Sequence, residues 1–320
     1  MFASGDPSPT LSSMQERLEN GLVVRVTGGE VWVRVRDQTI ACSLRGRLRN
    51  QATTMSLVAG DRVTILRDST SQASLEAVLP RTSWVSRYVE RGSTERVVVA
   101  NLERMFVVIA AAEPPPRTAF LDRVLASAEW GHVAPCIVFN KTDLARGREL
   151  EAFLALYKPS GYEVVPTCVV TGKGVDELAS RIDHGVYAFV GESGVGKTSL
   201  VNRLDPSLDL RVQTIGERTG RGKHTTTNSQ LFPFRGGFLA DTPGMQTFGF
   251  PGTDDVGLAA CFPEIAGVDA PCRYNPCTHS HEPGCAVKAA VEEERIPAFR
   301  YQSYLAILVE VRERAKKKPW

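Results

Sequence analysis

No apolar run in this 320-residue chain approaches the length of a membrane helix. The longest, Met105 to Ala112, is far shorter than the roughly 18 residues that such a helix needs. The chain also lacks an excess of one charge, since its net charge is only +2. This excludes a protein that is basic throughout, so any basic surface must be local. Residues 1–20 lack the apolar core of a signal peptide, and we expect a disordered tail and a cytoplasmic protein.

The seven cysteines are unevenly placed. Four lie among apolar neighbours and are expected to be unreactive core thiols: Cys42, Cys136, Cys168 and Cys261. The other three crowd together as Cys272, Cys277 and Cys285. With one imidazole, from His279 or His281, they offer the donor set of a closed tetrahedral zinc site. Such a site leaves no position for a reacting water, so we expect a structural role, with free thiols as the alternative.

Residues 21–81 contain short runs that predict a small β-barrel. Val31, Val33 and Val35 alternate with larger polar or aromatic residues, which places the valines on one face. The segment holds nine arginines and five acidic residues, a local charge of +4. An aromatic ring among arginines suits RNA, although a plain solvated surface is the alternative. The candidate RNA-binding residues here are Trp32, Arg34, Arg36, Arg45, Arg47 and Arg49.

Apolar runs alternate with helical patterns over residues 82–250. Strands are expected at 104–110, 133–139, 162–169, 186–190, 231–234 and 237–240, and helices at 117–130, 149–157, 174–182 and 197–204. This alternation predicts an α/β domain with a largely parallel sheet covered on both faces. Residues 251–320 contain the cysteine cluster and then a helical stretch that we expect to break near Pro297.

One segment matches the phosphate-binding loop in full. It reads Gly191-Glu192-Ser193-Gly194-Val195-Gly196-Lys197-Thr198, followed by Ser199, and it lies between an apolar run and a helical pattern. Glycines let backbone N–H groups surround an anion, and the helix N-terminus adds positive potential. We expect Lys197 to neutralise phosphate oxygens and Thr198 to bind Mg²⁺.

Three further motifs each follow an expected strand. Asp241-Thr242-Pro243-Gly244 offers a carboxylate for Mg²⁺ and a glycine N–H for the γ-phosphate. Asn140-Lys141-Thr142-Asp143 ends in a carboxylate that can accept two hydrogen bonds from guanine, which adenine does not offer. Thr171-Gly172-Lys173 is the expected companion loop at the base. Each motif alone also suits an ordinary turn.

The motifs stand in an unusual order, because the guanine motif precedes the phosphate loop by about fifty residues. A circular permutation preserves a sheet when the original termini lie close together. The permuted order, the preceding barrel and the following cysteine cluster resemble the RsgA (YjeQ) family of circularly permuted GTPases. The resemblance spans the chain from about Gly21 onward.

This resemblance implies an OB-fold barrel at 21–81, a permuted GTPase domain at 82–250 and a mainly helical zinc-binding domain at 251–320. It implies Mg²⁺ with GTP, one zinc ion per chain, and binding to the small (30S) ribosomal subunit and its rRNA during late maturation. We expect a monomer. The resemblance favours His279 as the zinc ligand.

The glycine-rich segment between the phosphate loop and Asp241 suits a mobile switch. The resemblance favours Thr225 and Thr226 as its nucleotide contacts, while Arg221 and Lys223 are expected to meet rRNA. Met245 stands where many GTPases carry a glutamine that positions water, and a thioether cannot do this. His224 is the expected replacement, with a phosphate or RNA contact as the alternative.

These observations predict a GTPase whose hydrolysis is stimulated by the small subunit. One alternative is a nucleotide-gated RNA-binding module with negligible hydrolysis. The other is a small-molecule kinase, against which the guanine motif argues.

Overall fold

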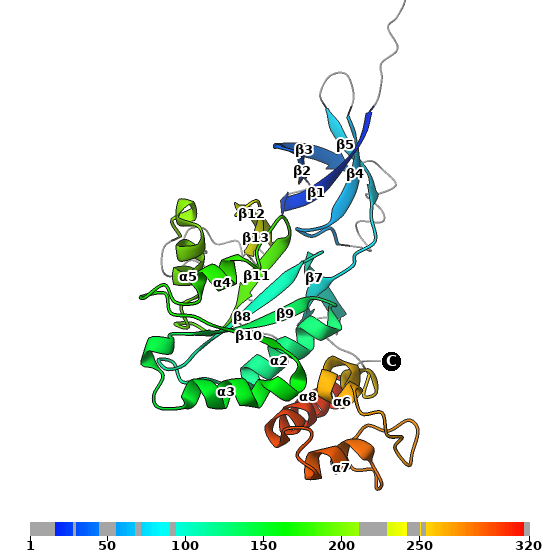
Figure 1. The fold of residues 1–320 in the computed structure, drawn as a ribbon. Coiled ribbons are helices and arrows are strands. Elements are labelled where there is room, and N and C mark those ends of the chain that lie inside the picture. Colours follow the sequence, from blue (N-terminus) through cyan, green and yellow to red (C-terminus); the bar gives the residue numbers. More distant parts are fainter. Residues whose placement is uncertain are drawn as a thin grey trace, which may run out of the picture.

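The computed structural model describes residues 17–27, 30–44, 56–67, 72–89, 94–210, 229–241, 250 and 254–316. Figure 1 shows three parts along the chain: an N-terminal β-barrel, a central α/β domain and a C-terminal group of helices beside α2. None of the helices in these ranges is both long enough and apolar enough to span a bilayer.

The predicted barrel is present and closed. Its sheet runs in the order β1-β2-β3-β5-β4, and β4 pairs back with β1. Its strands are β1 (Arg17–Thr27), β2 (Glu30–Val35), β3 (Gln38–Leu44), β4 (Arg62–Arg67) and β5 (Ala73–Val78). Val31, Val33 and Val35 point into the barrel core and are at most 5% exposed, as their alternation predicts.

The prediction of a disordered tail over residues 1–20 is wrong for its last four residues. Residues 17–20 already belong to β1, where Asn20 pairs with Thr64 and Glu19 with Ile65. The strand continues because these residues complete the closure of the barrel against β4, a long-range pairing that local composition does not reveal.

The central domain contains the expected parallel sheet. Its strands follow the order β10-β9-β8-β11-β13-β12, in which only β12 runs antiparallel to its neighbour in the domain. The strands are β8 (Arg104–Ala110), β9 (Ala134–Asn140), β10 (Glu163–Pro166), β11 (Val186–Val190), β12 (Gln230–Phe234) and β13 (Gly237–Asp241). The helices are α2 (Thr118–Trp130), α3 (Glu149–Tyr157), α4 (Val175–Ala179) and α5 (Lys197–Leu204).

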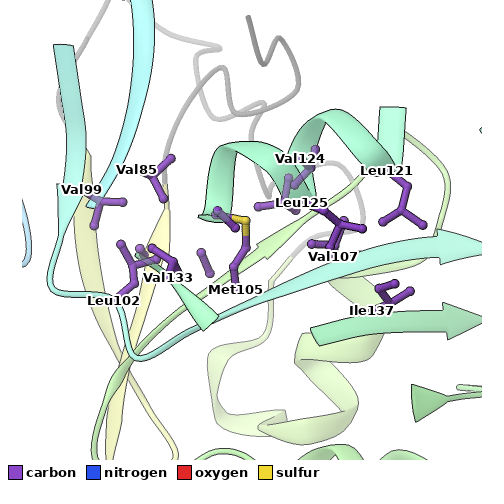
Figure 2. Close-up of a cluster of buried hydrophobic side chains, with 14 of the residues drawn as sticks. Val85, Val99, Leu102, Met105, Val107, Leu121, Val124, Leu125, Val133 and Ile137 are labelled. Atoms are coloured by element: carbon purple, nitrogen blue, oxygen red, sulfur yellow. The ribbon is translucent and has the colours of Figure 1, made fainter. Parts of the chain in front are cut away.

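Helices cover both faces of this sheet, and β8 contributes to the core on each side. Met105 and Val107 belong to the core formed with α2 and α3, which Figure 2 shows with Leu121 and Val124 of α2 above the strands. Phe106 alternates with them and joins the other core, formed with α4 and α5. A strand buried on both faces reads as a continuous apolar run, as this one does.

Two local expectations need correction. The strand expected over 162–169 ends at Pro166, and the chain then turns back so that the N–H of Cys168 bonds to the carbonyl of Lys173 at 2.9 Å. The sequence pattern also missed an antiparallel hairpin of β6 (Trp84–Val89) and β7 (Thr94–Ala100), which forms a separate two-stranded sheet.

The barrel and the central sheet are continuous. β1 pairs with β12 through Arg25 and Gln230, which joins both into an 11-stranded sheet. A second seam forms at Gly60, whose carbonyl accepts a hydrogen bond of 2.9 Å from the Asn101 side chain. A Cβ at Gly60 would lie 1.9 Å from the carbonyl oxygen of Ala100, so only glycine permits this close approach.

The C-terminal region is helical, and its long stretch breaks where expected, before Pro297. The helices are η4 (Gly257–Cys261), α6 (Pro263–Ala266), α7 (Ala286–Glu292) and α8 (Ala298–Lys316). Their core includes Phe250 together with Ala126 of α2. Phe250 therefore packs with the C-terminal helices.

Candidate functional site

The phosphate-loop segment connects the buried strand β11 to α5, as the motif requires. A Cβ at Gly191 would lie 2.3 Å from the carbonyl oxygen of Val108, and Gly196 has a left-handed φ of 96°. Side chains at these positions would clash or strain the backbone, so the glycines permit the turn. The ammonium of Lys197 lies inside the loop and donates to the carbonyls of Gly191 at 2.9 Å and Glu192 at 2.7 Å.

The guanine motif lies directly against this loop. Asn140 ends β9, is 1% exposed, and donates from Nδ2 to the carbonyl of Val195 at 2.9 Å. A Cβ at Gly196 would lie 2.4 Å from the same nitrogen. Two motifs far apart in the sequence therefore form one wall, because their strands both end at the carboxyl edge of the sheet.

Asp143 follows in a short 3-10 turn, η1 (Thr142–Leu144), with its carboxylate exposed. Cys168 Sγ lies 3.1 Å from Asp143 Oδ1 and accepts a contact of 3.4 Å from the N–H of Thr171. The companion loop thus reaches the guanine motif through Cys168. In that loop, the N–H of Gly172 bonds back to the Cys168 carbonyl at 2.8 Å, while Thr171 and Lys173 are exposed.

Sequence reasoning missed two residues of this site. Thr167 is completely buried and donates from Oγ1 to Asn140 Oδ1 at 3.0 Å, which orients the amide. Cys168 is buried, as expected of a core thiol, but it also contacts Asp143. Their position just before Thr171 was the available signal, because a loop at the base must begin where its strand ends.

The residues expected to bind Mg²⁺ lie on adjacent parts of the same edge. Thr198 is 8% exposed in the first turn of α5, and Asp241 is the last residue of β13. β11 and β13 are parallel neighbours, with Tyr187 opposite Leu239. Asp241 therefore ends β13, and Thr198 follows β11 after the phosphate loop, at the same edge of the sheet. Ser193 and Gly194 are exposed on the loop, Val195 is buried beneath it, and Ser199 follows in α5.

Several expected site residues fall outside the described ranges. These are His224, Thr225, Thr226, Gly244, Arg221 and Lys223 around the switch, and Arg45, Arg47 and Arg49 in the barrel.

The cysteine cluster gathers around His279. The ligand atoms of Cys272, Cys277, His279 and Cys285 all lie within 4.8 Å of one another. The imidazole Nδ1 is 3.6 Å from Cys272 Sγ and 3.4 Å from Cys285 Sγ. Backbone N–H groups also point at the sulfurs, as that of Ala286 does toward Cys272 at 3.4 Å. His281 is exposed instead, with its Nδ1 3.0 Å from the Ser280 hydroxyl. Three sulfurs and one imidazole at this spacing can hold a metal ion.

Hydrogen bonds connect the cysteine cluster to α8. Tyr301 donates from its hydroxyl to the carbonyl of His279 at 2.7 Å, and Tyr304 donates to that of Thr278 at 2.6 Å. Glu282 accepts the N–H of Thr278 at 2.8 Å. The loop that carries the cysteine cluster and the long helix α8 therefore form one unit.

Cys42, Cys136 and Cys261 are buried and behave as core thiols. Burial raises the pKa of Cys42 to about 11 and the pKa of Cys136 to about 12. It also raises the pKa of Cys261 to about 12. These thiols stay protonated at neutral pH and are poor nucleophiles.

Trp32 occupies the joint between the barrel and the central domain. It is half-buried and packs against the core shared with α2, and the guanidinium carbon of Arg25 lies 4.9 Å from the centre of its ring. This position favours a structural role for Trp32 between the barrel and the central domain, rather than a role as an exposed ring on which RNA bases stack. Arg34 reaches solvent and pairs with Asp37 at 3.7 Å, and Arg36 is exposed in the turn after β2.

The comparisons with known proteins agree with this arrangement. The family model described as RsgA GTPase matches residues 78–251. A small ribosomal subunit biogenesis GTPase RsgA from Gemmatimonas aurantiaca is 41% identical over 302 residues, covering 92% of this chain and 98% of the relative. One from Bacteroides fragilis is 37% identical, covering 92% and 97%.

Two solved structures have the same fold. YjeQ from Thermotoga maritima has a TM-score of 0.75 and 30% identity, covering 92% of this chain and 99% of that one. YloQ, titled a circularly permuted GTPase, has a TM-score of 0.73 and 26% identity, covering 93% and 96%. The barrel, the permuted order and the cysteine cluster thus have one common explanation: the chain belongs to the RsgA family of circularly permuted GTPases.

Proposed function

We propose that this GTPase acts in the biogenesis of the small ribosomal subunit, and that the subunit stimulates its hydrolysis of GTP. Its relatives are named small ribosomal subunit biogenesis GTPases, and these names support the small subunit as the partner. The hydrogen bond from Asn140 to Val195 carries the proposal for the site, because it joins the guanine motif to the phosphate loop.

In this pocket Asp143 selects guanine, and Asn140 holds the two motifs together. Cys168 and Thr171 support Asp143 from the companion loop. Lys197 exchanges its carbonyl partners for phosphate oxygens when nucleotide binds, as the position of its ammonium inside the loop supports. The buried hydroxyl of Thr198 and the carboxylate of Asp241 are oxygen donors suited to Mg²⁺. When bound, that ion neutralises charge that develops on the phosphates.

The switch supplies the remaining groups. Thr225, Thr226 and Gly244 contact the phosphates or their ion, and His224 orients the attacking water in place of the glutamine that Met245 replaces. Because a histidine on a loop acts only once that loop is ordered, turnover without the subunit is slow. This slow basal rate is the reason that a partner can regulate the enzyme.

The cluster of three cysteines and His279 holds one Zn²⁺ in a structural role. The chemistry of its donors supports this ion, since three thiolates and one imidazole match zinc better than magnesium or calcium. All four positions of a tetrahedron are filled by protein, and the site shapes the loop that α8 holds.

The barrel and the switch meet the rRNA of the subunit. Arg34 and Arg36 reach solvent on the barrel surface, and Arg45, Arg47, Arg49, Arg221 and Lys223 add to the positive charge. We assign Trp32 to the joint with the central domain rather than to RNA. The protein works in the cytoplasm as a monomer that binds through these phosphate contacts.

The test is a titration of GTP turnover with purified small subunits, with ATP measured in parallel. We expect turnover to rise with subunit concentration for GTP only. An equal rate with ATP would contradict the role of Asp143, and a rate independent of subunits would contradict the stimulation.

A further inference from the structure

The loop between β8 and α2 lies against both nucleotide motifs, although no motif marks it as part of the pocket. Its Glu113 carbonyl accepts a hydrogen bond from the ammonium of Lys141. On the other side, a Cβ at Gly194 would lie 3.6 Å from Cδ of Pro114. Three successive prolines, Pro114 to Pro116, stiffen the loop and remove backbone donors. The loop therefore touches the guanine motif and the phosphate loop at once.

The loop ends in an ion pair with the phosphate loop. Arg117 donates to the carboxylate of Glu192 at 2.8 Å, and the two side chains are 70% and 22% exposed. Lys197 donates to the carbonyl of the same glutamate at 2.7 Å. Glu192 is thus held at its backbone by Lys197 and at its carboxylate by Arg117.

A carboxylate at this position works against the ligand that the loop binds. Backbone N–H groups of a phosphate loop attract a polyanion, whereas a negative side chain on the same loop repels it. The repulsion is larger for a triphosphate than for a diphosphate, because the added phosphoryl group carries more charge. A cation paired with Glu192 removes most of this repulsion.

We propose that Arg117 is a positioning residue of the nucleotide pocket: it neutralises Glu192 and holds the phosphate loop ready for a triphosphate. The inference rests on the proposed nucleotide site and adds a residue to it. Arg117 acts through Glu192 and is not a catalytic residue.

The experiment measures the Kd of GDP and of a non-hydrolysable GTP analogue by fluorescence titration of the full chain with Mg²⁺. Arg117→Ala should weaken the analogue about three- to fivefold and GDP less, as expected for an exposed ion pair. Arg117→Lys should keep most of the affinity. The difference should shrink at about 1 M salt, because salt screens exposed charges.

The double variant Arg117→Ala with Glu192→Gln separates charge from structure. We expect it to recover analogue binding to within about twofold of wild type, since the uncompensated carboxylate is gone. Arg104→Ala is the matched control, because it breaks a pair with Glu163 at the opposite edge of the sheet. It should leave both affinities unchanged.

Three outcomes are decisive. If the wild type binds neither nucleotide, the proposed site fails and not only the role of Arg117. If the wild type binds but Arg117→Ala binds both nucleotides equally well, the inference is overturned. If the double variant stays as weak as Arg117→Ala, the side chain supports the loop by packing, and neutralisation of Glu192 is wrong.

Discussion

The guanidinium of Arg300 on α8 donates a hydrogen bond of 2.8 Å to Asp122 on α2, although neither side chain has any exposed surface. Arg300 also donates to Glu264 at 2.6 Å, and Asp122 accepts from Tyr157 at 2.9 Å. Burial raises the pKa of Asp122 despite its cationic partner. The C-terminal helices are therefore attached to the GTPase domain through a buried charge network in which each charged group has a partner.

Removal of one partner should be costly. We expect Arg300→Met to lower the free energy of unfolding by about 3–5 kcal/mol, because Asp122 and Glu264 are left buried without their cation. Urea unfolding measures this loss. Addition of Asp122→Asn should recover part of it. The control is Arg295→Met, which breaks an exposed pair with Glu293 and should cost well under about 1 kcal/mol. Equal losses in Arg300→Met and Arg295→Met would contradict the network.

A second pair on the same interface predicts a pH dependence. The hydrogen bond from Arg123 holds the pKa of Glu310 below its ordinary value. A carboxyl group with a lowered pKa stabilises the fold above its unfolded pKa, and this contribution is lost as pH falls through the folded pKa. The stability difference between wild type and Arg123→Gln should therefore be largest near neutral pH and shrink below about pH 4. Urea unfolding at several pH values measures it, and a constant difference would contradict this pair.

The contact between Cys168 and Asp143 predicts a role for the thiol in nucleotide affinity. Cys168→Ala removes a polar partner of Asp143, the carboxylate that we propose selects guanine, and we expect GDP binding to weaken by roughly three- to tenfold. Cys168→Ser keeps a donor of similar size and is the matched control, with affinity near wild type. Titration with fluorescent GDP measures both. If Cys168→Ala and Cys168→Ser bind equally well, Cys168 acts only as a core residue.

Sequence reasoning succeeds for elements that have a strong local pattern. The bounds of β8, β11, α3 and α5 coincide with the expected ranges, because each has a strong local period or a motif that fixes its end. Cys272, Cys277, His279 and Cys285 also come together as expected, since their spacing in the sequence is short.

The misses have two causes: a local hairpin with a weak apolar pattern, and contacts between segments that lie far apart in the sequence. The β6–β7 hairpin carries charged residues such as Arg87 and Arg96 that weaken its apolar pattern. Arg25 joins Gln230 across about two hundred residues, and no local signal predicts that the barrel continues the central sheet. The role of Cys168 likewise depends on a side-chain contact that appears only once β10 ends beside β9.

The proposed role of His224 in hydrolysis can be tested by mutation. We expect His224→Ala to bind GTP with nearly wild-type affinity and to lose the turnover that small subunits stimulate. The reason is that a methyl group cannot orient the attacking water, while the phosphate loop still binds the nucleotide. Single-turnover hydrolysis with and without subunits measures the effect. Undiminished stimulated turnover would assign His224 to phosphate or RNA contact only.

The last prediction concerns the cluster of three cysteines and His279. The neighbouring His281 provides the control. Elemental analysis should find about one Zn²⁺ per wild-type chain and very little in Cys277→Ser, because a thiolate ligand is lost. Hydrogen exchange should then accelerate in α8, since Tyr301 and Tyr304 donate hydrogen bonds to the carbonyls of His279 and Thr278. GDP binding should persist, because within the described ranges the phosphate loop makes its hydrogen bonds with Asn140, Arg117 and Lys197 rather than with the cysteine cluster. His281→Ala should keep its full metal content, as its ring lies outside the cluster and faces solvent. Metal loss in His281→Ala with retention in His279→Ala would reverse the ligand assignment, whereas loss of GDP binding in Cys277→Ser would mean that the metal supports the nucleotide pocket as well.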